Sequence, residues 1–421
     1  MIASFILILL FSFILYRIKR DENGVPYSTV LLLFYTQLTG VISCIYVNSG
    51  VYITEQGRES FSTSADVVYV ILLFLFVFSF TIFQKIAISS LNKEFVIRSY
   101  NSGYFIVWSI AIVLLVLYAN VFLSDKIPLF HNDSNRFTFW VKDAFLKELN
   151  LIFGTLSIPI SSALGFFAFH NYYGKRFSNK KNRIIAVIFF FYLLYLALTG
   201  QRFNGFLVAI IFFMIPFFAF YKKADKKFFT KSLFIKIFAA ITVMFVIVYY
   251  SYKNSLGGII DEAGSPIAAM FYRIFVLQGH VFWGQYLEFI NGGGTEDFFF
   301  NAMDSTVYLL TPSPDFFIEN KINLANVFPG NILLSHGVLG VVFSILILAL
   351  YFATLSILIV KALLEGAIFR YVLLMQINLW GVGGLPNFDL NQIFGFKVLA
   401  GWFIFFSIYF LSTNFKKSAY G

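Results

Sequence analysis

Eleven long apolar runs divide this chain, and they constrain its fold more than any other feature. The hydrocarbon core of a bilayer is about 30 Å thick, and a helix of about 20 apolar residues crosses it. Backbone polar groups in lipid must be satisfied internally, so such runs permit an all-α fold. We predict an all-α polytopic membrane protein with about 11 transmembrane helices in a single domain, residues 1–421. The runs are 2–16, 27–48, 66–84, 103–123, 149–169, 184–199, 203–221, 233–252, 331–360, 367–385 and 393–413.

The composition places the chain outside the class of soluble globular proteins. Only 12% of its 421 residues are charged, whereas about a quarter are charged in a soluble domain. The first apolar run is followed, not preceded, by Arg17, Lys19 and Arg20. A cleaved signal peptide carries its basic residues first, so we expect a retained first helix. The single cysteine, Cys44, excludes an internal disulfide and a thiolate metal cluster.

Basic residues are concentrated in every second connecting segment. These segments hold 21 of the 31 Lys and Arg residues but only 5 of the 21 Asp and Glu residues. Cytoplasmic loops carry such an excess, so we predict a periplasmic N-terminus and a cytoplasmic C-terminus in a bacterial inner membrane. The net charge of +10 is then a topology signal, and nucleic acid is not an expected partner. The segments are 17–22, 85–98, 175–183, 222–236, 361–370 and 416–417.

The longest connecting segment, residues 253–330, falls on the predicted periplasmic side. Its length indicates that the working surface faces outward. Within it, the run 267–290 is helical in pattern but too polar for a lipid-facing span. At 100° per residue, Arg273, His280 and Glu288 form one polar stripe. The pattern is typical either of an interfacial or re-entrant helix whose stripe lines a wet cavity, or of an ordinary amphipathic helix whose stripe faces water.

One arginine stands alone between two apolar runs. Arg202 is the only charged residue from 184 to 221, and it lies at the midpoint of that stretch. Two helical passes of about 19 residues each reach roughly 28 Å, which matches the bilayer core. Arg202 is therefore predicted at the periplasmic membrane face, where Gly200 and Gly205 allow the chain to turn.

The arginines of the predicted periplasmic segments are candidates for binding a diphosphate. A guanidinium is planar, stays charged and presents a fork of donors that matches phosphate oxygens. A lipid diphosphate would have its head group at this depth and its tail between helices. The candidate diphosphate-binding residues are Arg58, Arg136, Arg202 and Arg273.

Candidate bases and sugar contacts lie in the same segments. His280, Glu288 and His336 are candidates to deprotonate an acceptor hydroxyl, and a histidine near a helix N-terminus tends toward the neutral form that suits a base. Aromatic rings offer apolar faces to sugar rings, although they also form the interfacial belt of membrane proteins. The candidate glycan-binding residues are Gln201, Asn204, Tyr272 and Trp283.

Several other chemistries lack the residues that they need. The four histidines, His131, His170, His280 and His336, are scattered without ligand spacing, so we expect no metal. The chain has no Walker loop and no G-x-S-x-G elbow, and we expect no cofactor. Asp and Glu cluster in loops, which disfavours ion-coupled transport.

Two short motifs and the overall layout resemble one family. The turn TGQRFNG between two central spans, and the segment NVFPGNILLSHGVLG after a large external loop, resemble the Wzy-type O-antigen and polysaccharide repeat-unit polymerases. The resemblance implies a metal-independent membrane glycosyltransferase of the GT-C class that acts in lipopolysaccharide biosynthesis. Such an enzyme moves a growing glycan from one undecaprenyl diphosphate onto a new lipid-linked repeat unit. Many members carry an acidic or aromatic residue at the position of His336.

The resemblance also implies partners and roles. The substrate would be an undecaprenyl-diphosphate-linked oligosaccharide held in membrane lipid, and a polysaccharide co-polymerase would regulate chain length. Arg202 and Arg273 would hold the diphosphate leaving group. The alternatives are an O-antigen ligase that transfers the glycan to lipid A core, a flippase or transporter of lipid-linked oligosaccharides, and a scaffold protein.

Overall fold

The computed structural model describes most of the chain, and all regular structure in the described residues is helical. The described residues are 2–20, 29–50, 62–90, 103–131, 139–149, 155–173, 179–201, 203–219, 242, 246, 249, 264–265, 267–268, 271, 277–292, 330–382 and 393–418. The α-helices are α1 (Ile2–Arg20), α3 (Leu31–Asn48), α4 (Ala65–Ser90), α5 (Gly103–Phe122), α8 (Ser157–Tyr173), α9 (Asn179–Leu198), α10 (Phe203–Ala219), α14 (Leu277–Ile290), α17 (Gly330–Leu364), α18 (Ile368–Val382) and α20 (Phe396–Ser418). A π-helix, η2 (Phe139–Asp143), and a 3-10 helix, η3 (Lys147–Leu149), lie between α5 and α8.

The α-helices fall where the apolar runs predict them. Ten of the eleven runs coincide with an α-helix, and the remaining run, 233–252, lies almost entirely outside the described residues. These long apolar helices indicate a membrane-embedded protein. Five of them are long and apolar enough to cross a membrane: Leu31–Asn48, Ala65–Ile86, Phe105–Phe122, Lys181–Leu198 and His336–Leu364.

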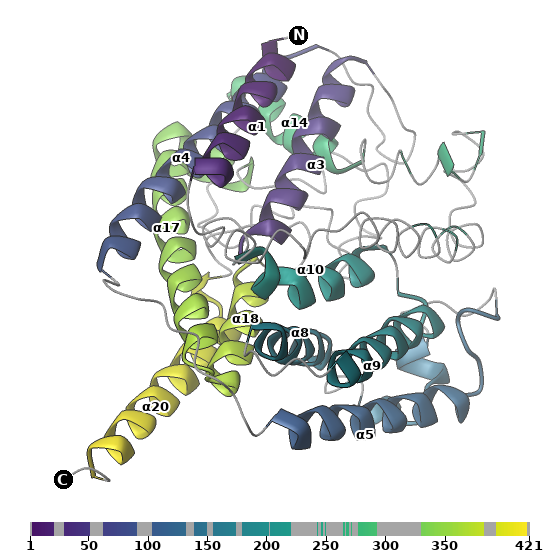
Figure 1. The fold of residues 1–421 in the computed structure, drawn as a ribbon. Coiled ribbons are helices and arrows are strands. Elements are labelled where there is room, and N and C mark those ends of the chain that lie inside the picture. The colour runs from purple at the N-terminus through teal and green to yellow at the C-terminus, as the bar shows by residue number, and fades with distance from the viewer. Residues whose placement is uncertain are drawn as a thin grey trace.

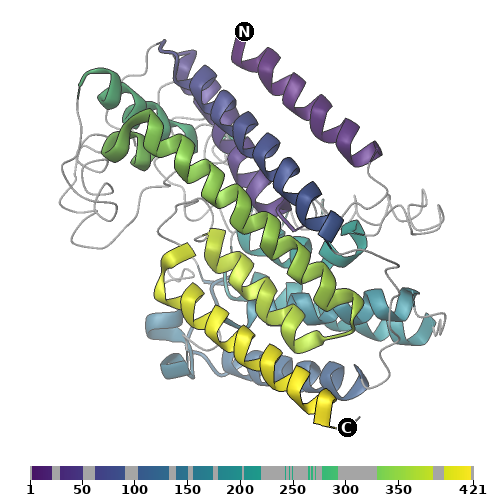
Figure 2. The same ribbon diagram turned by 90° about the vertical axis from the view of Figure 1, so that its left-hand side faces the viewer.

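The helices form two packed groups that are joined by α17. Helices α1, α3, α4 and α14 gather with α17 in the first group, and α4 packs along α17 most extensively. Helices α5, α8, α9, α10, α18 and α20 form the second group, which lies below the first in Figure 1. Helices α17, α18 and α20 run side by side in Figure 2, with α18 in the middle.

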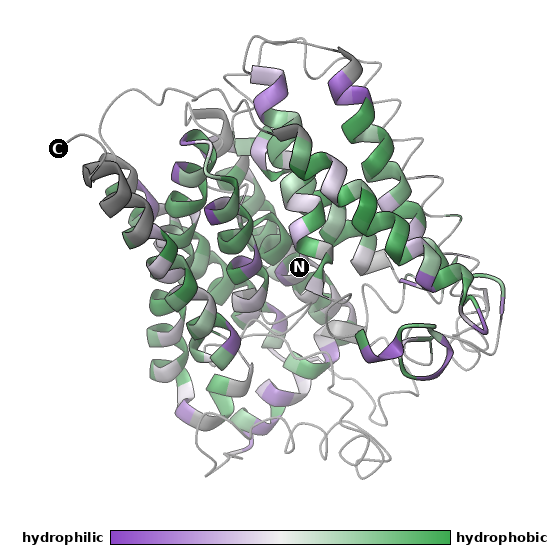
Figure 3. Ribbon diagram, turned by 90° about the horizontal axis from the view of Figure 1, so that it is seen from below, coloured by the Kyte–Doolittle hydropathy of each residue, from purple (hydrophilic) through white to green (hydrophobic). Residues whose placement is uncertain are grey.

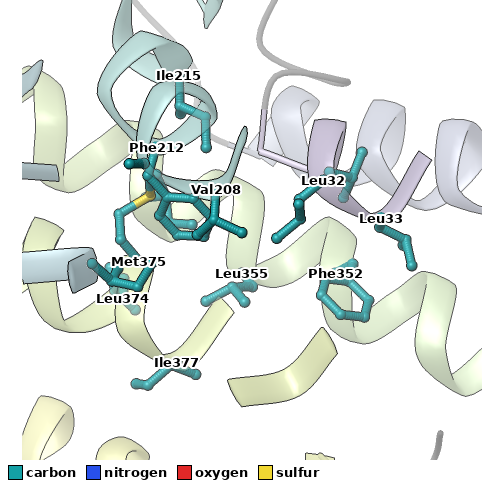
Figure 4. Packing of buried hydrophobic residues seen from close by; sticks show 14 of the residues in the cluster. Leu32, Leu33, Val208, Phe212, Ile215, Phe352, Leu355, Leu374, Met375 and Ile377 are labelled. Carbon is teal, nitrogen blue, oxygen red and sulfur yellow. The ribbon is translucent and has the colours of Figure 1, made fainter. Parts of the chain in front are cut away.

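The two groups share one apolar core. Figure 4 shows Leu32 and Leu33 of α3, Phe212 of α10, Phe352 of α17 and Met375 of α18 in a single cluster, and none of these side chains is more than 2% exposed. Apolar residues also dominate the helices in Figure 3. Since lipid is as apolar as these side chains, close packing rather than exclusion from water holds such helices together.

The turn after α9 has the geometry that the glycine at its centre predicts. Gly200 has a φ of 68°, its N–H donates to the Ala197 carbonyl (3.0 Å), and the Gln201 N–H donates to the Leu196 carbonyl (3.0 Å). These two bonds form a Schellman motif, in which a left-handed glycine ends a helix. The chain therefore leaves α9 sharply and enters α10 at Phe203.

Helix α10 packs mainly on α8 rather than on α9, although the sequence predicts a hairpin of α9 and α10. A Cβ added to Gly165 of α8 would lie 2.3 Å from the Phe213 carbonyl oxygen of α10. The two backbones therefore touch at this point, because Gly165 has no side chain to separate them. A short turn dictates that two helices are consecutive, but the packing of small residues decides which helix is the neighbour.

Helix α17 is bent near its first turns. The run 331–360 predicts one uninterrupted pass, but Gly337 has a φ of 63° and a ψ of −167°. Essentially only glycine adopts this conformation. The bend separates residues 330–336, which lie next to α14, from the long segment that follows.

Candidate functional site

Helix α14 lies inside the first helix group, in contact with α3, α4 and α17. It covers the second half of the predicted segment 267–290. A Cβ added to Gly279 would lie 2.0 Å from the Cys44 backbone nitrogen, and the Gly279 N–H donates to Ser43 Oγ at 2.6 Å. The start of α14 is therefore fixed against the backbone of α3 by one glycine and one hydrogen bond.

Helix α4 contacts α14 through aromatic rings. The rings of Tyr69 and Phe282 lie 4.5 Å apart between centroids, and the Tyr69 hydroxyl donates to Gln37 Oε1 of α3 at 2.9 Å. One turn further along α14, the Tyr286 hydroxyl hydrogen-bonds with Ser64 Oγ at 2.6 Å. These contacts connect α3, α4 and α14 into one unit.

His280 and Trp283 occupy the interior of this unit. Their exposed fractions are 2% and 0%. The two rings lie nearly parallel, with an interplanar angle of 8° and centroids 5.2 Å apart. An ordinary amphipathic helix would keep such a histidine in bulk water, whereas this imidazole is enclosed by protein. The arrangement can hold a proton-transfer group inside a membrane-embedded bundle.

The last turns of α14 approach the start of α17. Gln285 is fully buried, and a Cβ added to Gly330 would lie 1.7 Å from Gln285 Oε1. Glu288, one turn later, is half-buried. His336 is exposed and directly precedes the bend of α17 at Gly337. Of the three candidate bases, His280 is thus enclosed, Glu288 is at the edge and His336 is on the surface.

Asn48 joins the ends of α3 and α4 beside this unit. Its Nδ2 donates to the Thr63 carbonyl (2.7 Å) and to Asp66 Oδ1 (2.9 Å). Its Oδ1 accepts from the Thr63 N–H (2.6 Å) and hydroxyl (2.8 Å). Asp66 is only 8% exposed. No sequence pattern marked Asn48 or Asp66 as functional, although Thr-Ser-Ala-Asp before an apolar run is typical of a helix start.

The remaining predicted residues are distributed over several parts of the chain. Gln201 is half-buried in the turn between α9 and α10, and its Oε1 would lie 2.9 Å from a Cβ added to Gly205. Asn204 lies in the first turn of α10. Arg58, Arg136, Arg202, Arg273 and Tyr272, as well as most of the segment 253–330, lie outside the described residues.

No group of three or more His, Cys, Asp or Glu side chains that could hold a metal ion occurs in the part of the chain that the structure describes.

Comparisons with known proteins found no matching family model, no matching curated protein and no matching solved structure. A functional assignment therefore depends on the residues and their geometry.

Proposed function

We propose that this protein is a membrane glycosyltransferase that polymerises undecaprenyl-diphosphate-linked oligosaccharide repeat units at the periplasmic face of a bacterial inner membrane. The proposal combines the resemblance of TGQRFNG and NVFPGNILLSHGVLG to repeat-unit polymerases with the structure of α14. It includes eleven spans, a GT-C-like architecture and a periplasmic N-terminus.

The observation that carries the proposal is the enclosure of His280 within the helix bundle. His280 is 2% exposed and lies parallel to a fully buried tryptophan ring, so an ionisable group is enclosed among apolar helices. Polar and ionisable residues at membrane depth are costly and mark functional sites by default. In a polymerase, the helices around His280 would open to admit the acceptor hydroxyl, and Trp283 would support the orientation of the imidazole.

The proposed reaction requires one base and one site for the leaving group. The acceptor hydroxyl oxygen forms a bond to the anomeric carbon of the donor glycan while the bond from that carbon to the diphosphate oxygen breaks. The diphosphate leaves with the bonding electrons, and the hydroxyl proton passes to His280, Glu288 or His336. Arg202 and Arg273 would stabilise the departing charge, and such a positioned donor can contribute about 3 kcal/mol or more.

The test is a reaction with purified components. The full-length protein receives a defined undecaprenyl-diphosphate-linked repeat unit in the presence of a chelator and without nucleotide. We expect a ladder of products that differ by one repeat, because the diphosphate linkage supplies the driving force. A folded protein that makes no product longer than one repeat, or that extends only lipid A core, contradicts the proposal.

Variants then separate the candidate residues. We expect His280→Ala and Arg202→Ala each to lower the rate of ladder formation by 100-fold or more, about the effect of losing one positioned catalytic group. His131→Ala, which changes an exposed histidine that the proposal does not use, is the matched control. Long chains from Arg202→Ala would remove Arg202 from the role of diphosphate ligand.

A further inference from the structure

Two cations converge at the turn between α17 and α18, at the opposite end of α17 from α14. Lys361 lies in the last turn of α17, and Arg370 lies in the first turn of α18. Lys361 Nζ is 6.0 Å from the ring centroid of Tyr409 on α20, and Arg370 Cζ is 5.7 Å from the same centroid. A cation within about 6 Å of an aromatic ring is attracted by its quadrupole. Three helices thus bring two positive charges to one ring.

The cluster carries more positive than negative charge. Glu365 Oε2 accepts a hydrogen bond from an Arg370 terminal nitrogen at 2.7 Å, and the two side chains are 32% and 15% exposed. Lys361 forms no ion pair with a carboxylate of the described residues. A guanidinium has five N–H donors, so the single bond to Glu365 leaves donors for an anion.

The turn that carries the cations has a defined geometry. Gly366 has a φ of 68°, its N–H donates to the Leu363 carbonyl (3.2 Å), and the Ala367 N–H donates to the Ala362 carbonyl (2.9 Å). The His170 Nε2–H of α8 also donates to the Leu363 carbonyl, at 2.8 Å. The backbone positions that carry the two cations are therefore set before any ligand binds, which lowers the entropic cost of binding.

The helices that carry the cluster also expose apolar side chains. Phe403 and Phe406 precede Tyr409 on α20 and are 75% and 48% exposed, and Phe369, next to Arg370, is 72% exposed. In a membrane these rings face acyl chains. A free phosphate ion would use only the cations, whereas a lipid with a phosphate head group would use both the cations and the rings.

We propose that Lys361 and Arg370 form a binding site for the phosphate head group of an anionic membrane lipid, with Tyr409 between the cations and the acyl chains along Phe403 and Phe406. Basic pockets between membrane helices bind anionic head groups in this way. The site is far from His280 along α17, and the inference does not depend on the proposed glycosyltransferase activity.

The experiment measures lipid selectivity. The full-length protein is reconstituted in phosphatidylcholine vesicles that contain spin-labelled phosphatidylglycerol or spin-labelled phosphatidylcholine, and electron spin resonance gives the fraction of motionally restricted lipid. We expect a preference for phosphatidylglycerol that falls about fivefold for each cation removed. Lys361→Gln is the first variant, because it leaves the pair of Arg370 and Glu365 intact, and the double change with Arg370→Gln follows.

Lys397→Gln is the matched control, because Lys397 is an exposed lysine near the other end of α20. The inference is wrong if Lys361→Gln keeps the preference of the original protein, or if Lys397→Gln reduces it equally. In a parallel arm, inorganic phosphate is added at millimolar concentration. Loss of the preference there would show a site for free phosphate and would also overturn the assignment to a lipid.

Discussion

Helices α14 and α8 are both enclosed by other helices, but different contacts hold them. Around α14, hydrogen bonds connect side chains and backbone of neighbouring helices: Gly279 to Ser43, and Tyr286 to Ser64. Around α8, aromatic rings and the close approach at Gly165 dominate, beside one hydrogen bond from His170 Nε2 to the Leu363 carbonyl of α17. Three fully buried hydroxyls there form no hydrogen bond in the described part of the structure: those of Ser161, Ser162 and Tyr371.

The difference distinguishes a region in which hydrogen bonds fix the orientation of a helix, around α14, from a region that supports the bundle, around α8. Apolar packing is tolerant of small shifts and rotations, whereas a hydrogen bond between two helices specifies one register. The polar contacts of α14 therefore specify where His280 points. The packing of α8 supports the bundle without specifying a chemical group. Four substitutions test this comparison.

The largest effect is expected from Gly279→Ala. A Cβ at this position would lie 2.0 Å from the Cys44 backbone nitrogen, and a backbone cannot yield as a side chain does. We expect a loss of stability of about 3 kcal/mol, at the upper end for overpacking. Thermal unfolding of the purified protein in detergent measures the change.

Gly381→Ala is the control for this prediction. Its added Cβ would lie 3.2 Å from a ring atom of Tyr351, which can move by a few tenths of an ångström. If Gly279→Ala unfolds at the same temperature as Gly381→Ala, the contact between α14 and α3 is looser than the comparison requires.

The second largest loss of stability is expected from Asn48→Ala. The substitution removes an amide that makes four hydrogen bonds: one to Asp66 and three with Thr63. A buried partner left unsatisfied costs about 1–3 kcal/mol, so we expect a lower unfolding temperature. Asn291→Ala, at an exposed asparagine after α14, should leave the unfolding temperature unchanged. Equal unfolding temperatures for both variants would mean that Asn48 does not stabilise the contact between α3 and α4.

Tyr286→Phe should also destabilise the protein, but less than Asn48→Ala does. The change deletes only the hydroxyl that bonds with Ser64. Hydrogen bonds between membrane helices contribute about 0.6 kcal/mol on average, so the expected destabilisation is small but measurable in the unfolding temperature. Ser64→Ala should give the same shift, and the double variant should add nothing further. Additive shifts would show that the two hydroxyls act independently.

Tyr371→Phe should have the smallest effect, with the opposite sign. The Tyr371 hydroxyl is fully buried and forms no hydrogen bond among the described residues. Removing a buried polar group without a partner is neutral or slightly stabilising. The same substitution of tyrosine by phenylalanine would thus destabilise around α14 and stabilise around α8. If Tyr371→Phe destabilises the protein as much as Tyr286→Phe does, the regions around α14 and α8 do not differ in the way described.

Sequence patterns could predict the helices but not their neighbours. Apolar length predicted the helices, and Gly200 predicted the turn after α9, because both are local properties of the chain. The polar pattern of 267–290 predicted a helix but left its surroundings open. The bend at Gly337 was not predicted, since glycine permits this conformation without requiring it. The arginine part of the candidate site, Arg202 included, lies outside the described residues and stays a prediction.

The amino-acid sequence by itself determined that this chain is helical and embedded in a membrane, because an apolar run of sufficient length must satisfy its own backbone polar groups. It placed those helices along the chain but not their exact ends: α8 begins at Ser157, whereas its apolar run begins at residue 149. Only the tertiary structure decided that His280 is enclosed while His336 is exposed, and that Lys361 and Arg370 meet at Tyr409. The reason is physical: both outcomes depend on contacts between helices distant in sequence, and small residues such as Gly279 and Gly165 set how closely those helices approach.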